Sequence, residues 1–362
     1  MGGGKITMTL HVFNPEHDIA LASGLRNFTS PHAGRQLRHD LGWIPALWCD
    51  KDDVVLVDDV ATAQHKSACF GVQNHRFCSS KVALLKPESG TFVSHVSPWG
   101  WDAALHERLK RMGVDVSIMP DEHQLSTIRA LSHRRTSMSL LPELRTDDTV
   151  GEAFECTSLD AVAAVQERYG HIVVKAPWSS SGRGVRFTDK PCDEHMSGWL
   201  RNVISQQGSV MAEPYYNKVK DFAMEFTAHA DGSVSYDGLS LFHTKNGSYT
   251  GNILATEGFK RERLSHYLPL KLIDSISQTV CQRLPMLLAG KYCGPLGIDM
   301  MVVGTEREGF LLHPCVEINL RNTMGHVALL LSERVNPQHD DDIVRVMRII
   351  YTNHYELKIQ KL

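Results

Sequence analysis

The chain has 362 residues, of which 42% are hydrophobic and 22% are charged. This composition excludes a disordered or fibrous chain and predicts two or three domains that each bury a core. The chain has 38 Lys and Arg and 41 Asp and Glu, so its formal net charge is −3. It lacks the basic excess that would indicate a nucleic-acid or membrane partner. The composition leaves a homo-oligomer open.

The eight cysteines include no C-x-x-C pair, which argues against a zinc or redox motif. No apolar stretch approaches the roughly 18–20 residues that a membrane helix needs. We therefore expect a cytoplasmic protein with reduced thiols and no membrane segment.

The first third of the chain alternates between short apolar runs and helical patterns. Residues 9–13, 54–57, 92–96 and 114–119 are predicted strands. A helix follows the third of them, with Ser97 as its predicted N-cap and Pro98 in its first turn. This alternation predicts an open, largely parallel α/β sheet.

A polar turn follows the first predicted strand, at the sheet edge where such folds bind ligands. This segment is either a turn whose polar side chains cap the backbone or a substrate site, and the sequence favours neither. The candidate substrate residues are Asn14, Glu16, His17 and Asp18.

The sequence pattern in the middle of the chain predicts a second domain that contains a hairpin. Helices are predicted at 121–131 and 159–169, with a domain boundary near the basic run 132–135. A strand ending at Lys175 leads into a Ser- and Gly-rich loop and then into the strand 185–187. A loop between two strands differs from a P-loop, which leads into a helix. Backbone N–H groups of small residues beside a lysine suit phosphate.

The last part predicts a hairpin over residues 222–240, turned at Asp231-Gly232. A long helix over 268–288 follows, which Pro285 is expected to kink or end. A final helix is expected to start at the acidic run 340–342.

Two further strands, 297–303 and 310–320, carry the clearest chemical pattern. Glu317, Asn319 and Arg321 alternate with apolar residues and therefore project from one face. If the two strands pair, Asp299 joins that face. Two carboxylates and an amide oxygen suit Mg²⁺ or Mn²⁺, and Arg321 beside them suits a transferring phosphoryl group.

Together these runs resemble the ATP-grasp superfamily, over roughly residues 121–330. The matching runs occur in the family's order and are IVVKAP at 172–177, SGRGV at 181–185, VMAEP at 210–214, GPLGIDM at 294–300 and VEINLR at 316–321. The resemblance implies an ATP-grasp fold of two α+β lobes behind an N-terminal α/β domain. The expected divisions are 1–120, 121–207 and 208–362, the last with the metal site and a C-terminal helix.

The resemblance also implies roles for single residues. Lys175 would touch the α- and β-phosphates, Lys245 the γ-phosphate, and Asp221 the ribose. The family's usual first lysine is replaced here by Arg134 or Arg135, and Pro214 departs from the usual hinge. The remaining nucleotide residues are the flap, Ser181, Gly182, Arg183 and Gly184, and the adenine hinge, Glu213, Tyr215 and Tyr216. Asp299, Glu317 and Asn319 would be the metal ligands, and Arg321 and Lys245 the catalytic residues.

The implied reaction is an ATP- and Mg²⁺-dependent ligation. A small carboxylate would be activated as an acylphosphate and attacked by an amine. Two alternatives stay open, a small-molecule kinase with the same metal site and a nucleotide-binding module without catalysis.

Overall fold

The computed structural model describes residues 6–79, 91–179, 182–245, 248–306 and 309–362. The chain divides into two compact units. Unit 1 holds Met1–Arg129 and Arg348–Lys358, and unit 2 holds Ala130–Met347 and Ile359–Leu362. The finer division at residues 120 and 207 stays a prediction. Within the described ranges, no helix combines the length and the apolar character needed to cross a membrane.

Unit 1 is built on a four-stranded sheet in the order β3-β2-β1-β4, and every pairing in it is parallel. This confirms the predicted parallel α/β sheet. The strands are β1 (Ile6–Val12), β2 (Val54–Leu56), β3 (Arg76–Cys78) and β4 (Thr91–Pro98). Buried Leu10, Val12 and Val96 pack against Leu105 and Leu109 of a flanking helix. The helices are α1 (His17–Ser23), α2 (His32–Leu41), η1 (Ile44–Leu47), α3 (Val60–Ala68), α5 (Ala103–Met112), η2 (Val116–Ile118) and α6 (Glu122–Leu131).

Two expectations in unit 1 are wrong. Ser97 and Pro98 end strand β4, where they pair with β1, and Asp102 caps α5 by accepting the N–H of Leu105 at 2.8 Å. Residues 114–119 form no strand but the short 3-10 helix η2. There the side chain of Asp115 accepts the N–H of Ser117 at 2.9 Å, a local bond that competes with strand pairing.

Unit 2 contains two sheets, of which the smaller has the order β5-β8-β6-β7. Its strands are β5 (Phe154–Cys156), β6 (Ile172–Lys175), β7 (Val185–Thr188) and β8 (Val210–Pro214). The antiparallel pairing of β6 with β7 confirms the predicted hairpin around the Ser- and Gly-rich loop. The helices near it are α7 (Arg135–Leu140), η3 (Leu141–Leu144), α8 (Leu159–Tyr169) and α9 (Glu194–Gln207).

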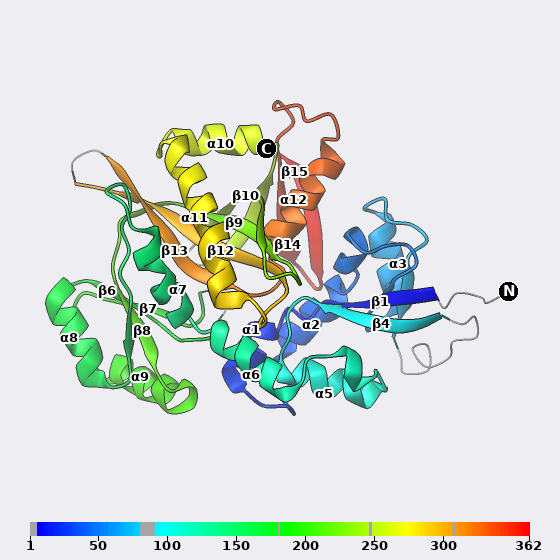
Figure 1. The fold of residues 1–362 in the computed structure, drawn as a ribbon, viewed down its shortest axis with the longest axis horizontal. Coiled ribbons are helices and arrows are strands. Elements are labelled where there is room, and N and C mark those ends of the chain that lie inside the picture. Colours follow the sequence, from blue (N-terminus) through cyan, green and yellow to red (C-terminus); the bar gives the residue numbers. More distant parts are fainter. Residues whose placement is uncertain (1–5, 80–90, 180–181, 246–247, 307–308) are drawn as a thin grey trace. The chain divides into compact units, whose positions relative to one another are not determined.

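The larger sheet has seven strands in the order β13-β12-β9-β10-β11-β14-β15. They are β9 (Lys218–Ala228), β10 (Val234–Lys245), β11 (Ser248–Leu254), β12 (Gly294–Gly304), β13 (Phe310–Asn319), β14 (Arg345–Tyr351) and β15 (Tyr355–Lys361). Alternate residues such as Phe222 and Met224 are buried against α11 (Leu270–Leu288), which runs along one face of this sheet (Figure 1). Pro285 lies inside α11 without ending it. The opposite face of the sheet carries Glu225, Asp299 and Glu317, and it is called the polar face below.

The polar face is partly covered by α12 (Met324–Val335), which contacts β9, β10 and β11. A shorter helix, α10 (Glu257–Ser265), packs against β10. The expected C-terminal helix starting at 340–342 is wrong, because the chain ends in the strands β14 and β15. Asp340 is instead held in a loop, where its N–H donates to Asn336 Oδ1 at 2.9 Å. The β-branched run that follows also favours strand over helix.

Candidate functional site

The predicted metal ligands lie together on the polar face of the large sheet. Strands β12 and β13 pair in antiparallel fashion, so Asp299 lies directly across from Glu317 and Gly297 across from Asn319. This confirms the strand pairing on which the predicted set depended. Two carboxylates and one amide oxygen therefore share a small area of one sheet face.

Asp299 is the most perturbed member of this set. Burial, and then the negative charge of Glu317 across the strand pair, raise the pKa of Asp299 to about 8. In the described part of the chain, no group donates a hydrogen bond to its carboxylate. A divalent cation would relieve this repulsion, since an adjacent positive charge favours the ionised form. The donor set thus fits a hard cation such as Mg²⁺.

Arg134 joins the metal carboxylates to the loop of the small sheet. Its side chain is 6% exposed. It donates to Glu317 Oε2 at 2.8 Å, to Ser179 Oγ at 2.8 Å and to the carbonyl of Ala176. Arg135 is half-exposed and pairs with Glu155 instead. Of the two alternatives, the geometry favours Arg134, whose guanidinium has the fork shape that suits phosphate oxygens.

Lys175 and Glu213 form a buried ion pair at the ends of β6 and β8. The Nζ of Lys175 donates to Glu213 Oε2 at 2.6 Å. Register places Lys175 beside Met211 and Glu213 beside Val173, so both project from the same face. Each predicted nucleotide residue thus neutralises the other in this structure, and a phosphate would compete for the lysine.

The flap between β6 and β7 is only partly described. Ser181 lies outside the described residues. Gly182 has a φ of +71°, which glycine adopts without strain. A Cβ on Gly184 would collide with Ser179. The carbonyl of Gly184 accepts the N–H of Ala176 at 2.8 Å. Arg183 is exposed.

Three other residues are predicted to contact the nucleotide, two tyrosines of the hinge and one aspartate of β9. Tyr215 is 45% exposed and its ring stacks on His171, with centroids 3.9 Å apart. Tyr216 is half-buried, and its ring meets the buried His313 edge-on at 5.5 Å. Asp221 on β9 accepts a hydrogen bond from Thr244 Oγ1 at 2.6 Å and pairs with Lys218.

The two predicted catalytic residues stand in different elements. Arg321 follows β13 and donates to Asn319 Oδ1 at 3.0 Å and to the carbonyl of Asn322 at 3.1 Å. It therefore lies beside a predicted metal ligand. Lys245 is the last residue of β10, and its role stays a prediction.

The candidate substrate residues belong to unit 1, where they make internal contacts. Asn14 donates to the carbonyl of Gly100 at 2.8 Å, and both Asn14 and His17 contact Asp102, at 3.1 Å each. Glu16 pairs with Arg38. Asp18 lies in the first turn of α1, where a carboxylate suits the helix dipole. A substrate role for these four residues stays a prediction.

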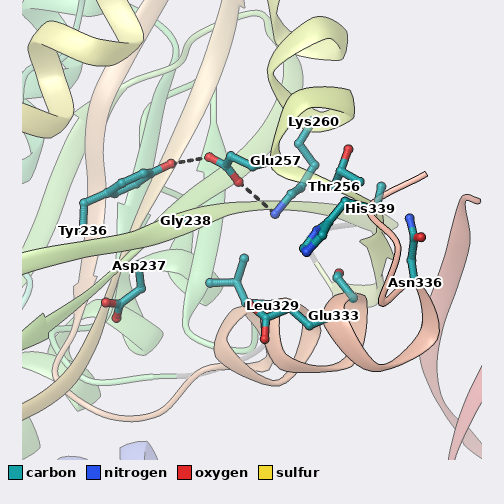
Figure 2. A pocket seen from close by; sticks show the side chains of 12 residues that line it. Tyr236, Asp237, Gly238, Thr256, Glu257, Lys260, Leu329, Glu333, Asn336 and His339 are labelled. Atoms are coloured by element: carbon teal, nitrogen blue, oxygen red, sulfur yellow. Dashed lines mark hydrogen bonds and ion pairs between the residues drawn. The ribbon is translucent and has the colours of Figure 1, made fainter. Parts of the chain in front are cut away.

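A separate cavity of about 200 Å³ lies in unit 2 (Figure 2). Two of its charged groups, Glu257 and Lys260, pair with each other. Glu257 accepts from Tyr236 at 2.8 Å and pairs at 3.0 Å with Lys260, whose Nζ also donates to the carbonyl of Leu239 at 2.6 Å. None of the predicted site residues lines this cavity.

Three polar residues near the site were missed by sequence reasoning. Ser179 accepts a hydrogen bond from Arg134. His313 is buried, and burial followed by the charge of Lys175 lowers its pKa to about 3. Glu225 is buried, and burial raises its pKa to about 8. The signal for Glu225 was present, because a lone carboxylate sits between the apolar residues Met224 and Phe226 of a strand.

Comparisons with known proteins identify the fold. No family model and no curated protein matches the sequence. N5-carboxyaminoimidazole synthetase from Staphylococcus aureus in complex with ADP is 14% identical, with a TM-score of 0.51 over 96% of this chain and 84% of that chain. Biotin carboxylase from Campylobacter jejuni is 11% identical, with a TM-score of 0.53 over 95% of this chain and 75% of that chain.

A third solved structure extends the same similarity. The biotin carboxylase domain of 2-oxoglutarate carboxylase from Hydrogenobacter thermophilus is 10% identical, with a TM-score of 0.54 over 96% of this chain and 75% of that chain. These are ATP-grasp proteins, and the chain therefore has the ATP-grasp fold. At such identities the similarity identifies the fold and leaves the reaction to the site residues.

Proposed function

We propose that this chain is an ATP- and Mg²⁺-dependent ligase that joins a small carboxylate to an amine. The observation that carries the proposal is the Asp299–Glu317 strand pair with Asn319 beside it, linked through Arg134 to the loop after Lys175. Support for the nucleotide comes from the similar folds, whose structures were determined with ADP and with MgADP and bicarbonate.

In the proposed reaction, a carboxylate oxygen of the substrate attacks the γ-phosphorus of ATP. The bond from that phosphorus to the bridging oxygen of the β-phosphate breaks, and ADP leaves. The amine nitrogen then attacks the acyl carbon, the bond from carbon to the phosphate oxygen breaks, and the amine loses a proton as phosphate departs. No covalent bond to the protein is required, so the side chains act by positioning and charge.

Each group of residues has one task in this proposal. Asp299, Glu317 and Asn319 would hold Mg²⁺, which when bound neutralises phosphate charge. Lys175 and Arg134 would exchange their carboxylate partners for phosphate oxygens. Arg321 would offset charge on the transferring phosphoryl group. Lys245 is proposed to contact the γ-phosphate.

The test is a screen of the purified full chain for ADP release. MgATP is supplied with pools of small carboxylates and amines, and active pools are repeated with hydroxylamine. We expect an acyl hydroxamate, which traps the acylphosphate. A stable phosphorylated product would identify a small-molecule kinase, and nucleotide binding without turnover would identify a binding module; either contradicts the proposal. The Asp299→Asn chain, purified identically, controls for contaminating ATPases.

A further inference from the structure

The polar face of the large sheet carries a buried carboxyl group to which the proposed reaction assigns no task. Glu225 of β9 is 1% exposed. Register places it beside Gly297 of β12, and Gly297 in turn lies beside Asn319 of β13. Glu225 therefore stands in the same cross-strand row as a predicted metal ligand, two strands away.

Two glycines provide the space that this carboxyl group fills. A Cβ on Gly297 would lie 2.5 Å from Glu225 Oε2, and a Cβ on Gly325 would overlap Glu225 Oε1. Neither glycine is among the positive-φ positions of the described chain. A side chain at either position would therefore displace Glu225, with Thr323 the next contact at Gly297 and Ser240 the next at Gly325.

Glu225 is hydrogen-bonded to Thr323, the N-cap residue of α12. Thr323 Oγ1 donates to Glu225 Oε2 at 2.9 Å, and the same hydroxyl accepts the N–H of Gly325 at 3.0 Å as the helix N-cap. The Nδ1 of His326 lies 3.2 Å from Glu225 Oε2 and accepts the N–H of Thr323 at 3.2 Å. The carboxyl group thus fixes the first turn of the helix to the sheet.

The segment held in this way carries Arg321. At one end, Asn319 is fixed by its pairing with Gly297, and at the other end Thr323 is fixed by Glu225. Between them, the N–H of Arg321 donates to the carbonyl of Asn319 at 2.9 Å, and its guanidinium donates to Asn319 Oδ1 at 3.0 Å. The position of the Arg321 side chain therefore depends on both anchors.

We propose that Glu225 is a positioning residue that holds Arg321 against Asn319 through its hydrogen bond with Thr323. The inference rests on the proposed function, because it assigns Arg321 to the phosphoryl group. Loss of the anchor displaces Arg321 by a fraction of a side chain while leaving the nucleotide-binding residues of the small sheet in place. Misplacement of this size costs about 10²-fold in rate.

The test compares four variants of the full chain on the substrates found in the screen. Glu225→Ala and Thr323→Val each remove the anchor, and we expect kcat to fall about 10–100-fold while KM for ATP changes less than about threefold. Glu225→Gln and Thr323→Ser keep a hydrogen-bonding group of similar size, and we expect them to recover most of the lost kcat.

Thr227→Val is the matched control. Thr227 lies on the same strand as Glu225, and its hydroxyl also donates to a carboxylate, Asp237 Oδ2, at 2.7 Å. We expect its kcat to equal that of the wild type. An unchanged kcat in folded Glu225→Ala would overturn the proposal. So would an equal loss in Glu225→Ala and Glu225→Gln, since that would indicate a role other than the bond to Thr323.

A second readout separates this proposal from the proposed function. If the wild type releases no ADP with any pool, the proposed function fails, and crystal structures of the wild type and Glu225→Ala then decide the positioning role. We expect the Arg321–Asn319 hydrogen bond to be lost in Glu225→Ala. Its retention at the length seen in the wild type would overturn the proposal.

Discussion

The two units place polar side chains on their sheets in contrasting ways. In unit 1, Asn14 and His17 follow the first strand and both contact Asp102 at the start of α5, and Asn14 also bonds the backbone of Gly100. In unit 2, the carboxylate of Asp299 receives no hydrogen bond from any described residue, and Glu317 pairs with Arg134, for which we propose a phosphate contact. Saturated hydrogen bonds indicate a folding role, and unsaturated carboxylates indicate a ligand.

The largest effect is expected at the unsaturated carboxylates. Asp299→Asn and Glu317→Gln each keep the shape of the site but remove a charge that a divalent cation needs. We expect ADP release to fall at least about 10²–10³-fold in both variants, with the free energy of unfolding unchanged or increased in Asp299→Asn. Asp274→Asn, which alters a half-exposed carboxylate on α11, is the control. A variant of Asp299 with full activity would place the metal elsewhere.

The saturated cluster of unit 1 is expected to respond in stability. Asp102→Ala leaves buried His17 and Asn14 without their shared partner and removes the cap of α5. We expect a loss of about 3–5 kcal/mol in the free energy of unfolding, measured by urea denaturation of the full chain. A stable Asp102→Ala chain with a raised KM for a substrate would instead favour the substrate role of this turn.

A pH effect on unit 1 is expected from Asp40, whose side chain is 1% exposed. Burial by itself would raise the pKa of this carboxyl. Hydrogen bonds from Gln36 and from the N–H of Tyr355 outweigh it and lower the pKa to about 2 from 3.8. A carboxyl group whose pKa is lower in the folded chain than in the unfolded chain stabilises the fold at pH values above the unfolded pKa. This stability is therefore lost as the pH falls from about 4 to about 2.

The expected size of the Asp40 contribution is about 2 kcal/mol. Denaturation curves of the wild type and Asp40→Asn, recorded between pH 2 and pH 6, measure it. Asp40→Asn should flatten this part of the pH dependence. An equally steep curve in the variant would assign the acid sensitivity to other groups.

A smaller effect is expected from Arg134→Lys. Lysine keeps the charge but cannot bond Glu317, Ser179 and Ala176 at once, as the arginine does. We expect KM for ATP to rise about tenfold with little change in stability. Arg135→Lys, at the half-exposed neighbour, is the control. Equal effects of the two changes would contradict the assignment of the phosphate contact to Arg134.

The sequence predicted those parts of the molecule that alternation and turn residues specify locally. The parallel sheet of unit 1 and the hairpin after Lys175 are of this kind, and the pairing of Asp299 with Glu317 meets the condition that the predicted metal set carried. The 114–119 run and the acidic run at 340–342 were misjudged because side-chain bonds of Asp115 and Asn336 set the local backbone. Propensity does not include such bonds.

Direct contacts within the site were predictable where the residues are close in the sequence. Glu317 and Asn319 share strand β13, Arg321 follows two residues later, and the three were predicted together. The bond from Thr323 to Glu225 joins residues 98 positions apart, and the bond from Arg134 to Glu317 joins residues 183 positions apart. No period or motif connects such pairs, since packing of the folded chain brings them together.

The most direct test of the account is the affinity for MgADP measured by isothermal titration calorimetry. The wild type and the double variant Asp299→Asn, Glu317→Gln are compared, with and without Mg²⁺. We predict that Mg²⁺ strengthens ADP binding to the wild type at least about tenfold and has no effect on the double variant. An equal gain from Mg²⁺ in both chains would contradict the claim that this strand pair holds the metal.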